Sequence, residues 1–137
     1  MEEGVLLLPY SVNAKFSFVD LEDLAEAARV ILTEPGHVNA MYELAGTGPM
    51  SHVEVAEIIS HVLNRSIRAE KEEISDWRLR TEGMSEYAVV NLVSMFEYYE
   101  RWGLVGNANA LRWILKRVPT SLEKFVDRII RERDAID

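Results

Sequence analysis

A glycine turn is the first stretch of this sequence whose residues could do chemistry. Gly46 and Gly48 follow a short run at residues 42–44, and a patterned helix begins directly afterwards. Glycines between a strand and a helix let backbone N–H groups and the positive helix end approach a pyrophosphate. Ser51, however, stands where a dinucleotide motif has its third glycine, and Pro49 lacks an amide donor. The spacing allows a phosphate turn or a structural turn, and it favours the structural one.

Histidines and carboxylates give no clear catalytic pattern. The histidines, at positions 37, 52 and 61, lack the spacing of three or four residues that two metal ligands on one helix need. Ser51 is followed by His52, but no G-x-S-x-G turn surrounds the serine, so we do not expect a nucleophile there. A run of carboxylates is predicted to be solvated rather than to form a general acid–base pair; it comprises Glu70, Glu72, Glu73 and Asp76.

Aromatic side chains gather in the second half of the chain. On a helix predicted over residues 86–102, Phe96 and Tyr99 share one face, and Tyr98 and Trp102 share another. The helix is therefore either buried on several sides or forms the wall of a pocket for a flat or apolar ligand. The candidate pocket residues are Trp77, Tyr87, Tyr98, Trp102 and Trp113.

Composition limits the classes of partner. The 137 residues are 48% hydrophobic, which is enough for a single domain over residues 1–137 with a core of its own. The net charge of −8 argues against binding to nucleic acid or to an anionic membrane surface, since both need clustered Lys and Arg. There is no cysteine, and the apolar run at residues 5–8 is too short for a membrane span. We expect a cytoplasmic protein without a bound metal.

The elements that must position these residues give an α/β, helix-rich fold. We expect a small sheet of about three to four short strands in the N-terminal half, packed by helices and followed by a helical C-terminal part. The strands are predicted at residues 5–8, 16–19, 42–44 and, from a weaker signal, 67–70.

Two helices are marked by their caps. Asp20 is predicted to cap a helix through Leu32. Its inward stripe is predicted to comprise Leu21, Leu24, Ala25, Ala28, Ile31 and Leu32. Ser51 and Glu54 form a capping box for a helix that ends near residue 63 and covers the sheet.

Four further helices are predicted in succession after the second capped helix. They cover residues 75–82, 86–102 and 110–117, and a last one begins at Thr120. Thr120 and Glu123 have the spacing of a second capping box.

The strand at residues 5–8 is continuous in its hydrophobicity, which is typical of a strand covered on both faces. Its neighbours must come from later in the chain or from another molecule. We therefore predict a homo-oligomer through this N-terminal strand, because an unpaired apolar edge is rarely left exposed. In the alternative, the later helices fold back over the edge and the chain is a monomer.

The order of four segments resembles the C-terminal half of NmrA-like proteins, an atypical branch of the extended short-chain dehydrogenase/reductase superfamily. The segments are FSFVDLEDLAEAARVILTEPGH, MYELAGTGPMSHVEVAEIISHVLNRSIRAE, ISDWR and RVPTSLEKFVD. In that family an N-terminal Rossmann half binds NADP or NAD, and the C-terminal half shapes the pocket for a substrate or effector. Some members are reductases, and others are regulators without catalysis.

The sequence departs from this family in lacking the Rossmann half and the Tyr-x-x-x-Lys pair of catalytic relatives. The resemblance therefore implies a non-catalytic, ligand-binding or regulatory module that binds a small apolar or aromatic ligand. We expect no nucleotide cofactor on the isolated chain. The alternative is a remnant or subunit of an NAD(P)-dependent oxidoreductase that needs a separate Rossmann half.

Overall fold

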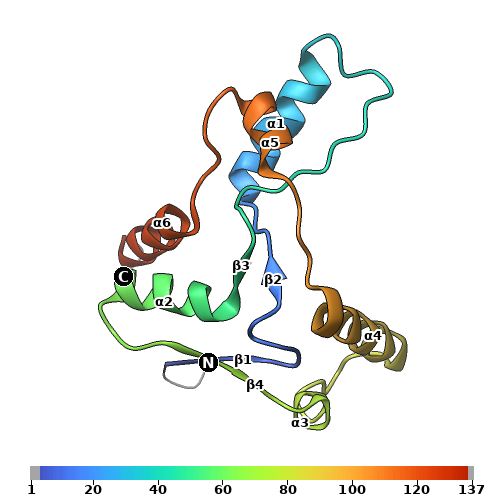
Figure 1. Cartoon of the computed structure of the whole chain (residues 1–137), viewed down its shortest axis with the longest axis vertical. Helices are drawn as coiled ribbons and strands as arrows, with labels where there is room; N and C mark the ends of the chain where they lie inside the picture. Colours follow the sequence, from blue (N-terminus) through green and yellow to red (C-terminus); the bar gives the residue numbers. More distant parts are fainter. Residues whose placement is uncertain (1–3, 136–137) are drawn as a thin grey trace. The chain divides into compact units, whose positions relative to one another are not determined.

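The computed structural model describes residues 4–135, which form an α/β, helix-rich fold as predicted (Figure 1). Its strands are β1 (Val5–Leu8), β2 (Lys15–Phe16), β3 (Met50–Ser51) and β4 (Arg68–Lys71). Its helices are α1 (Leu21–Thr33), α2 (His52–Leu63), α3 (Ile74–Arg78), α4 (Glu86–Trp102), α5 (Ala108–Leu115) and α6 (Leu122–Asp134). Within this described range, none of the helices is long and apolar enough to cross a membrane.

The chain forms two compact units, and each is built from two separate stretches of sequence. Unit 1 contains the residues up to Lys15 together with Ser51–Leu104. Unit 2 contains Phe16–Met50 together with the residues from Val105 onward. The two-residue strands β2 and β3 lie where the chain passes from one unit to the other.

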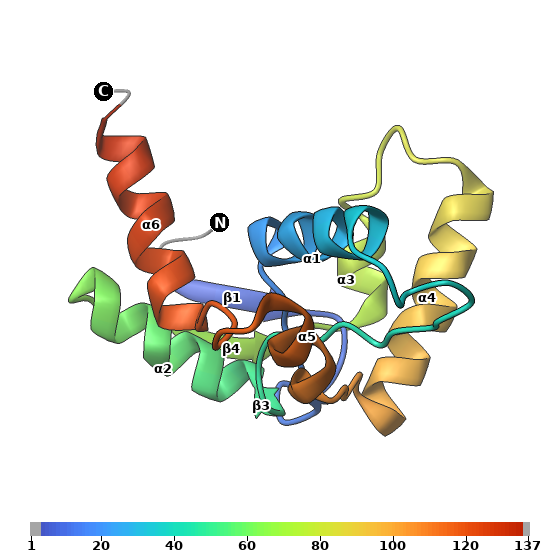
Figure 2. The same ribbon diagram turned by 90° about the horizontal axis from the view of Figure 1, so that it is seen from above.

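Unit 1 is built on a parallel pair of strands. Val5 of β1 lies opposite Arg68 of β4, and Leu8 lies opposite Lys71, so both strands end at the same edge (Figures 1 and 2). The predicted strands at residues 5–8 and 67–70 are therefore confirmed, and the neighbour of β1 comes from later in the chain. Leu8 is buried, whereas the other three residues of β1 are only half-buried.

Helix α2 packs against β4, and its N-terminal end has the predicted capping box. The Glu54 amide donates to Ser51 Oγ at 3.2 Å, and the Ser51 amide donates to Glu54 Oε2 at 2.6 Å. Two N–H groups that the first helical turn leaves unsatisfied thus find acceptors locally. This reciprocal pairing explains why the helix could be placed from sequence alone.

Helix α4 has the bounds predicted for it and ends at Gly103. This glycine has a φ of 63°, and a Cβ atom at its position would collide with the backbone of Lys15. The next residue, Leu104, donates its amide to the Lys15 carbonyl at 2.9 Å. The end of α4 is therefore fixed by a backbone approach that only glycine permits.

The core of unit 2 lies between α1 and α5, which pack together (Figures 1 and 2). Its buried members are Ala27, Val30, Leu111, Ile114 and Leu115. The stripe predicted for α1 is wrong in part, because Leu21, Ala25, Ala28 and Leu32 are exposed. The buried face instead follows Asp23, Ala27 and Val30, and it includes the carboxylate because partners from elsewhere in unit 2 satisfy it.

Two further predictions need correction. Residues 42–44 do not form a strand, although Tyr42 and Leu44 pack against the core of unit 2. At the start of α6 the cap is Ser121, whose side chain accepts from the Lys124 amide, and not Thr120. The Thr120 hydroxyl donates to Asp23 instead, so the predicted second capping box does not form.

Candidate functional site

The five predicted pocket residues are divided between the two units. Trp77 packs edge-to-face on Phe96 in unit 1, with ring centroids 4.8 Å apart. Tyr87, Tyr98 and Trp102 are exposed on α4, and the exposed Trp113 belongs to unit 2. None of the five lines either cavity described below. Their assignment as a ligand pocket therefore stays a prediction.

The glycine turn uses its amides within unit 2. The amides of Gly46 and Thr47 both donate to the Phe18 carbonyl, at 2.8 and 2.9 Å. A Cβ on Gly46 would lie 2.9 Å from that carbonyl oxygen, so the close approach of the two segments requires glycine. Of the two interpretations of this turn, the geometry favours the structural one, because these two donors are already satisfied.

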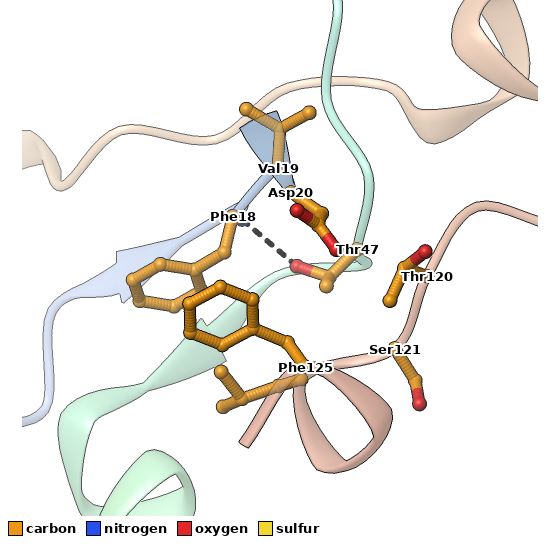
Figure 3. A pocket seen from close by; sticks show the side chains of 8 residues that line it. Phe18, Val19, Asp20, Thr47, Thr120, Ser121 and Phe125 are labelled. Carbon is orange, nitrogen blue, oxygen red and sulfur yellow. Dashed lines mark hydrogen bonds between the residues drawn. The ribbon is translucent and has the colours of Figure 1, made fainter. Parts of the chain in front are cut away.

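Beside this turn lies a cavity of about 230 Å³, which we call the Thr47 cavity (Figure 3). It is lined by Phe18, Val19, Asp20, Thr47, Thr120, Ser121, Leu122 and Phe125. The dashed line in Figure 3 marks the Phe18 amide donating to Thr47 Oγ1 at 2.9 Å. Asp20 accepts two hydrogen bonds from Arg128, at 2.8 and 2.7 Å. The polar side chains of this cavity are thus used by the fold, which leaves an apolar space.

A buried carboxylate fixes the segment that leads into α6. Asp23 is only 1% exposed; it accepts from the Thr120 amide at 2.5 Å and from Arg117 at 2.7 Å. Burial alone would raise the pKa of Asp23, but these hydrogen bonds outweigh it and lower the pKa below its ordinary value. Asp23 is therefore ionised at neutral pH and attaches residues 117–120 to the first turn of α1.

A second cavity, of about 490 Å³, lies in unit 1 where β1 and β4 end, and we call it the carboxyl-edge cavity. It is lined by Pro9, Lys71, Glu72, Glu73, Ile74, Ser75, Phe96, Glu97, Glu100 and Arg101. Pro9 directly follows β1, and the Glu72 amide donates to the Leu8 carbonyl at 2.9 Å, just beyond the paired residues. In parallel sheets, ligands bind outside the carboxyl ends of the strands. The position of this cavity corresponds to the place at which ligands bind in such sheets.

Glu100 joins two segments of this cavity. Its Oε1 lies 2.9 Å from Lys71 Nζ, and its Oε2 accepts from the Ser11 amide at 2.6 Å. The hydrogen bond from Lys71, more than that from Ser11, holds the pKa of Glu100 below its ordinary value. The carboxylate stays charged at neutral pH and ties α4 to the loop after β1.

Glu72 is the most buried carboxylate in the carboxyl-edge cavity. Its side chain is 7% exposed, and its Oε1 accepts from Arg80 at 2.6 Å. Its Oε2 is buried and has no hydrogen-bond partner within the described part of the chain. The prediction that the carboxylate run is solvated is thus wrong for Glu72, although Glu70, Glu73 and Asp76 are exposed.

One aromatic side chain, that of Phe96, lines the carboxyl-edge cavity. Phe96, the buried residue of α4, contacts Trp77 and lies with its ring centroid 5.8 Å from that of Tyr10. Burial raises the pKa of Tyr10, so its hydroxyl stays protonated at neutral pH. The pocket predicted from sequence near α4 and Trp77 shares no lining residue with this cavity, and the carboxylates of the cavity were not among the candidate pocket residues. The signal that could have found them is their position directly after a strand.

No protein-family model matches the chain. Over 67 residues it is 36% identical to an NAD(P)H azoreductase of Xenophilus azovorans, a match that covers 49% of the chain and 23% of the azoreductase.

Solved structures match nearly the whole chain. The NADPH-dependent quinone oxidoreductase QOR2 of Escherichia coli superposes with a TM-score of 0.78 at 21% identity, covering 94% of this chain and 47% of that one. Triphenylmethane reductase of a Citrobacter species superposes with a TM-score of 0.78 at 21% identity, and the match covers 95% of this chain and 45% of the reductase. NmrA, a negative transcriptional regulator solved with NAD, superposes with a TM-score of 0.64 at 15% identity, and the match covers 100% of this chain and 48% of NmrA. The resemblance to NmrA-like proteins is thus confirmed for the fold, and the chain spans about half the length of these structures.

Proposed function

We propose that this chain is the ligand-binding half of an NmrA-like protein and that it binds a small molecule in the carboxyl-edge cavity. It acts as a substrate or effector module and supplies no catalytic group of its own. The observation that supports this most directly is the position of the cavity, which opens where the parallel strands β1 and β4 both end. Its volume of about 490 Å³ lies in the range of about 300–1,000 Å³ that is usual for small-molecule sites.

The Thr47 cavity is the weaker candidate. Its volume of about 230 Å³ lies below that range, and its polar side chains are already engaged within unit 2. It offers no group that could orient a ligand, whereas the carboxyl-edge cavity offers several.

An aromatic ligand body fits the carboxyl-edge cavity. Phe96 supplies an apolar floor, and Trp77 supports the Phe96 ring. The names of the relatives point the same way, because they describe enzymes that act on quinones, on triphenylmethane dyes and, for an azoreductase, on azo compounds. All three are flat or ring-containing molecules.

A second candidate function is that of a subunit or remnant of an NAD(P)-dependent oxidoreductase. The 36% identity to an NAD(P)H azoreductase favours it, and it requires a Rossmann half supplied by another chain. NADPH oxidation that appears only when such a half is mixed with this chain would support it. The absence of turnover in a mixture that forms a stable complex would exclude it.

We also propose that two copies of the chain associate through β1. Within the described residues β1 pairs with β4 alone, which leaves its other edge without a neighbouring strand. Sedimentation equilibrium tests this: a single species of 15.7 kDa up to about 100 μM, far above a micromolar dissociation constant, would exclude the dimer.

The proposed ligand site is tested by titration calorimetry with 1,4-naphthoquinone, 4-hydroxyazobenzene and a triphenylmethane dye. Ser75 lines the cavity and is exposed, so Ser75→Trp should fill it and weaken binding at least about tenfold. Ser94→Trp is the matched control, since Ser94 is exposed on α4 outside the cavity.

A double variant, Tyr98→Ala with Trp102→Ala, distinguishes this site from the pocket predicted from sequence. We expect it to change affinity by less than about twofold, because neither side chain lines the cavity. Loss of binding in the double variant, together with normal binding in Ser75→Trp, would move the site to the exposed aromatic face of α4.

A further inference from the structure

We infer that the carboxyl-edge cavity selects a ligand that carries a cationic group with an N–H donor, and that Glu72 receives this group. The inference rests on the proposed function, and it names the chemical class that the site prefers. Its starting point is Glu72 Oε2, a buried acceptor without a partner in the described part of the chain. Buried polar atoms are nearly always hydrogen-bonded, and Glu72 lines the cavity, so its unused oxygen marks a residue that could take a donor from a ligand.

The Arg80 guanidinium accounts for only one oxygen of this carboxylate. It lies 2.6 Å from Oε1 and fixes the orientation of the Glu72 side chain, of which only 7% is exposed. A charged acceptor held in a poorly solvated wall forms a stronger hydrogen bond with a cation than with a neutral donor. The group that completes this site is therefore expected to be charged.

The charged side chains around the cavity also favour a cationic ligand. The cavity wall contains four carboxylates and two cationic side chains. One of these cations, Lys71, is already paired with Glu100. Glu73 and Glu97 have no ion-pair partner within the described residues, so a cationic ligand enters a field that favours it.

The cation is an organic one. No group of three or more His, Asp or Glu side chains within the described residues could hold a metal ion. Glu72 has one unpaired oxygen, which can accept one N–H from an ammonium or amidinium group of the ligand. Phe96 and Ile74 offer apolar surface to the remaining part of the ligand. An arylalkylamine meets both requirements.

Three aromatic probes of similar size test this on the full chain: benzylammonium, benzyl alcohol and benzoate, titrated by calorimetry at pH 7. We expect benzylammonium to bind at least about tenfold more tightly than benzyl alcohol, and benzoate to bind most weakly. Equal affinities for the three probes would overturn the inference and leave the proposed site standing. Absence of binding by every probe up to about 10 mM, together with failure of the three aromatic probes named above, would overturn both.

Glu72→Gln identifies the residue responsible. The amide oxygen of glutamine still accepts from Arg80, but the charge is lost, so the preference for benzylammonium over benzyl alcohol should fall to less than about threefold. Glu57→Gln is the matched control, with the same change in net charge at an exposed position on α2 outside the cavity. An unchanged preference in Glu72→Gln would overturn the assignment. If this variant unfolds, as judged by circular dichroism, the order of the three probes on the unaltered chain still decides the inference.

Discussion

The Thr47 cavity and the carboxyl-edge cavity differ in whether their polar side chains have hydrogen-bond partners within the described chain. In the Thr47 cavity, Asp20 is bound to Arg128 and the Thr47 hydroxyl accepts from the Phe18 amide. In the carboxyl-edge cavity, Glu72 keeps a buried oxygen without a partner in the described chain. Polar groups that satisfy one another stabilise a fold, whereas a polar group left over on a cavity wall is available to a ligand. The unused oxygen of Glu72 is therefore one reason for which we propose the ligand site in the carboxyl-edge cavity.

The largest expected effect is on the stability of unit 2. Asp23→Ala removes the acceptor for Arg117 and for the Thr120 amide, and should lower the free energy of unfolding by about 2–4 kcal/mol, because hydrogen bonds to a charged group are lost and the Thr120 amide loses its acceptor. Urea unfolding measures this. Asp127→Ala is the matched control, because its ion pair with Arg131 is half-exposed, and it should change the free energy of unfolding by less than about 1 kcal/mol. Equal effects of the two variants would show that Asp23 does not fix the segment before α6.

A smaller effect is expected where the Thr47 cavity meets the glycine turn. Thr47→Val keeps the shape of the side chain but removes the hydroxyl that accepts from the Phe18 amide, so stability should fall by about 1–2 kcal/mol. Thr33→Val, at the exposed end of α1, serves as the control and should change stability by less than about 0.5 kcal/mol. A stabilised Thr47→Val variant would mean that the polar groups of this cavity do not support the fold.

The smallest expected effect depends on pH and concerns the cap of α2. Hydrogen bonds from Lys15 and then from Ser51 lower the pKa of Glu54 to about 2, from an ordinary value of 4.5. Because the folded-state pKa is the lower one, Glu54 stabilises the fold above pH 4.5, and this contribution is lost as the pH falls from 4.5 towards 2. Glu54→Gln should therefore lower the melting temperature at pH 7 and have little effect near pH 2.

The exposed Glu57 on the same helix provides the control for this titration. Glu57→Gln should give the same melting temperature as the unaltered chain at both pH values, since no ion pair of Glu57 is found within the described residues. A difference between Glu54→Gln and the unaltered chain that persisted unchanged to pH 2 would show that the cap does not depend on the charge of Glu54.

Features that depend on neighbouring residues were predicted well. The capping box of Ser51 and Glu54, the cap at Asp20 and the start of α4 at Ser85 all rest on side chains that satisfy backbone groups within one helical turn. The apolar run at residues 5–8 likewise indicated a parallel strand, because its hydrophobicity does not alternate.

Features that depend on distant residues were not predicted. Asp23 and Thr120 are 97 positions apart, and Glu72 is 8 positions from the arginine that binds it. Neither spacing affects the local hydrophobic periodicity, so Thr120 was assigned to a cap and Glu72 to the solvent.

What the sequence by itself determined is thus where helices begin, which strands are apolar and which family the order of segments resembles. The tertiary structure decided which face of α1 is buried and which carboxylate keeps an unused oxygen on a cavity wall. The physical reason is that a cap or a strand is stabilised by atoms a few residues away. The burial of a charge is stable only when partners from remote segments arrive together.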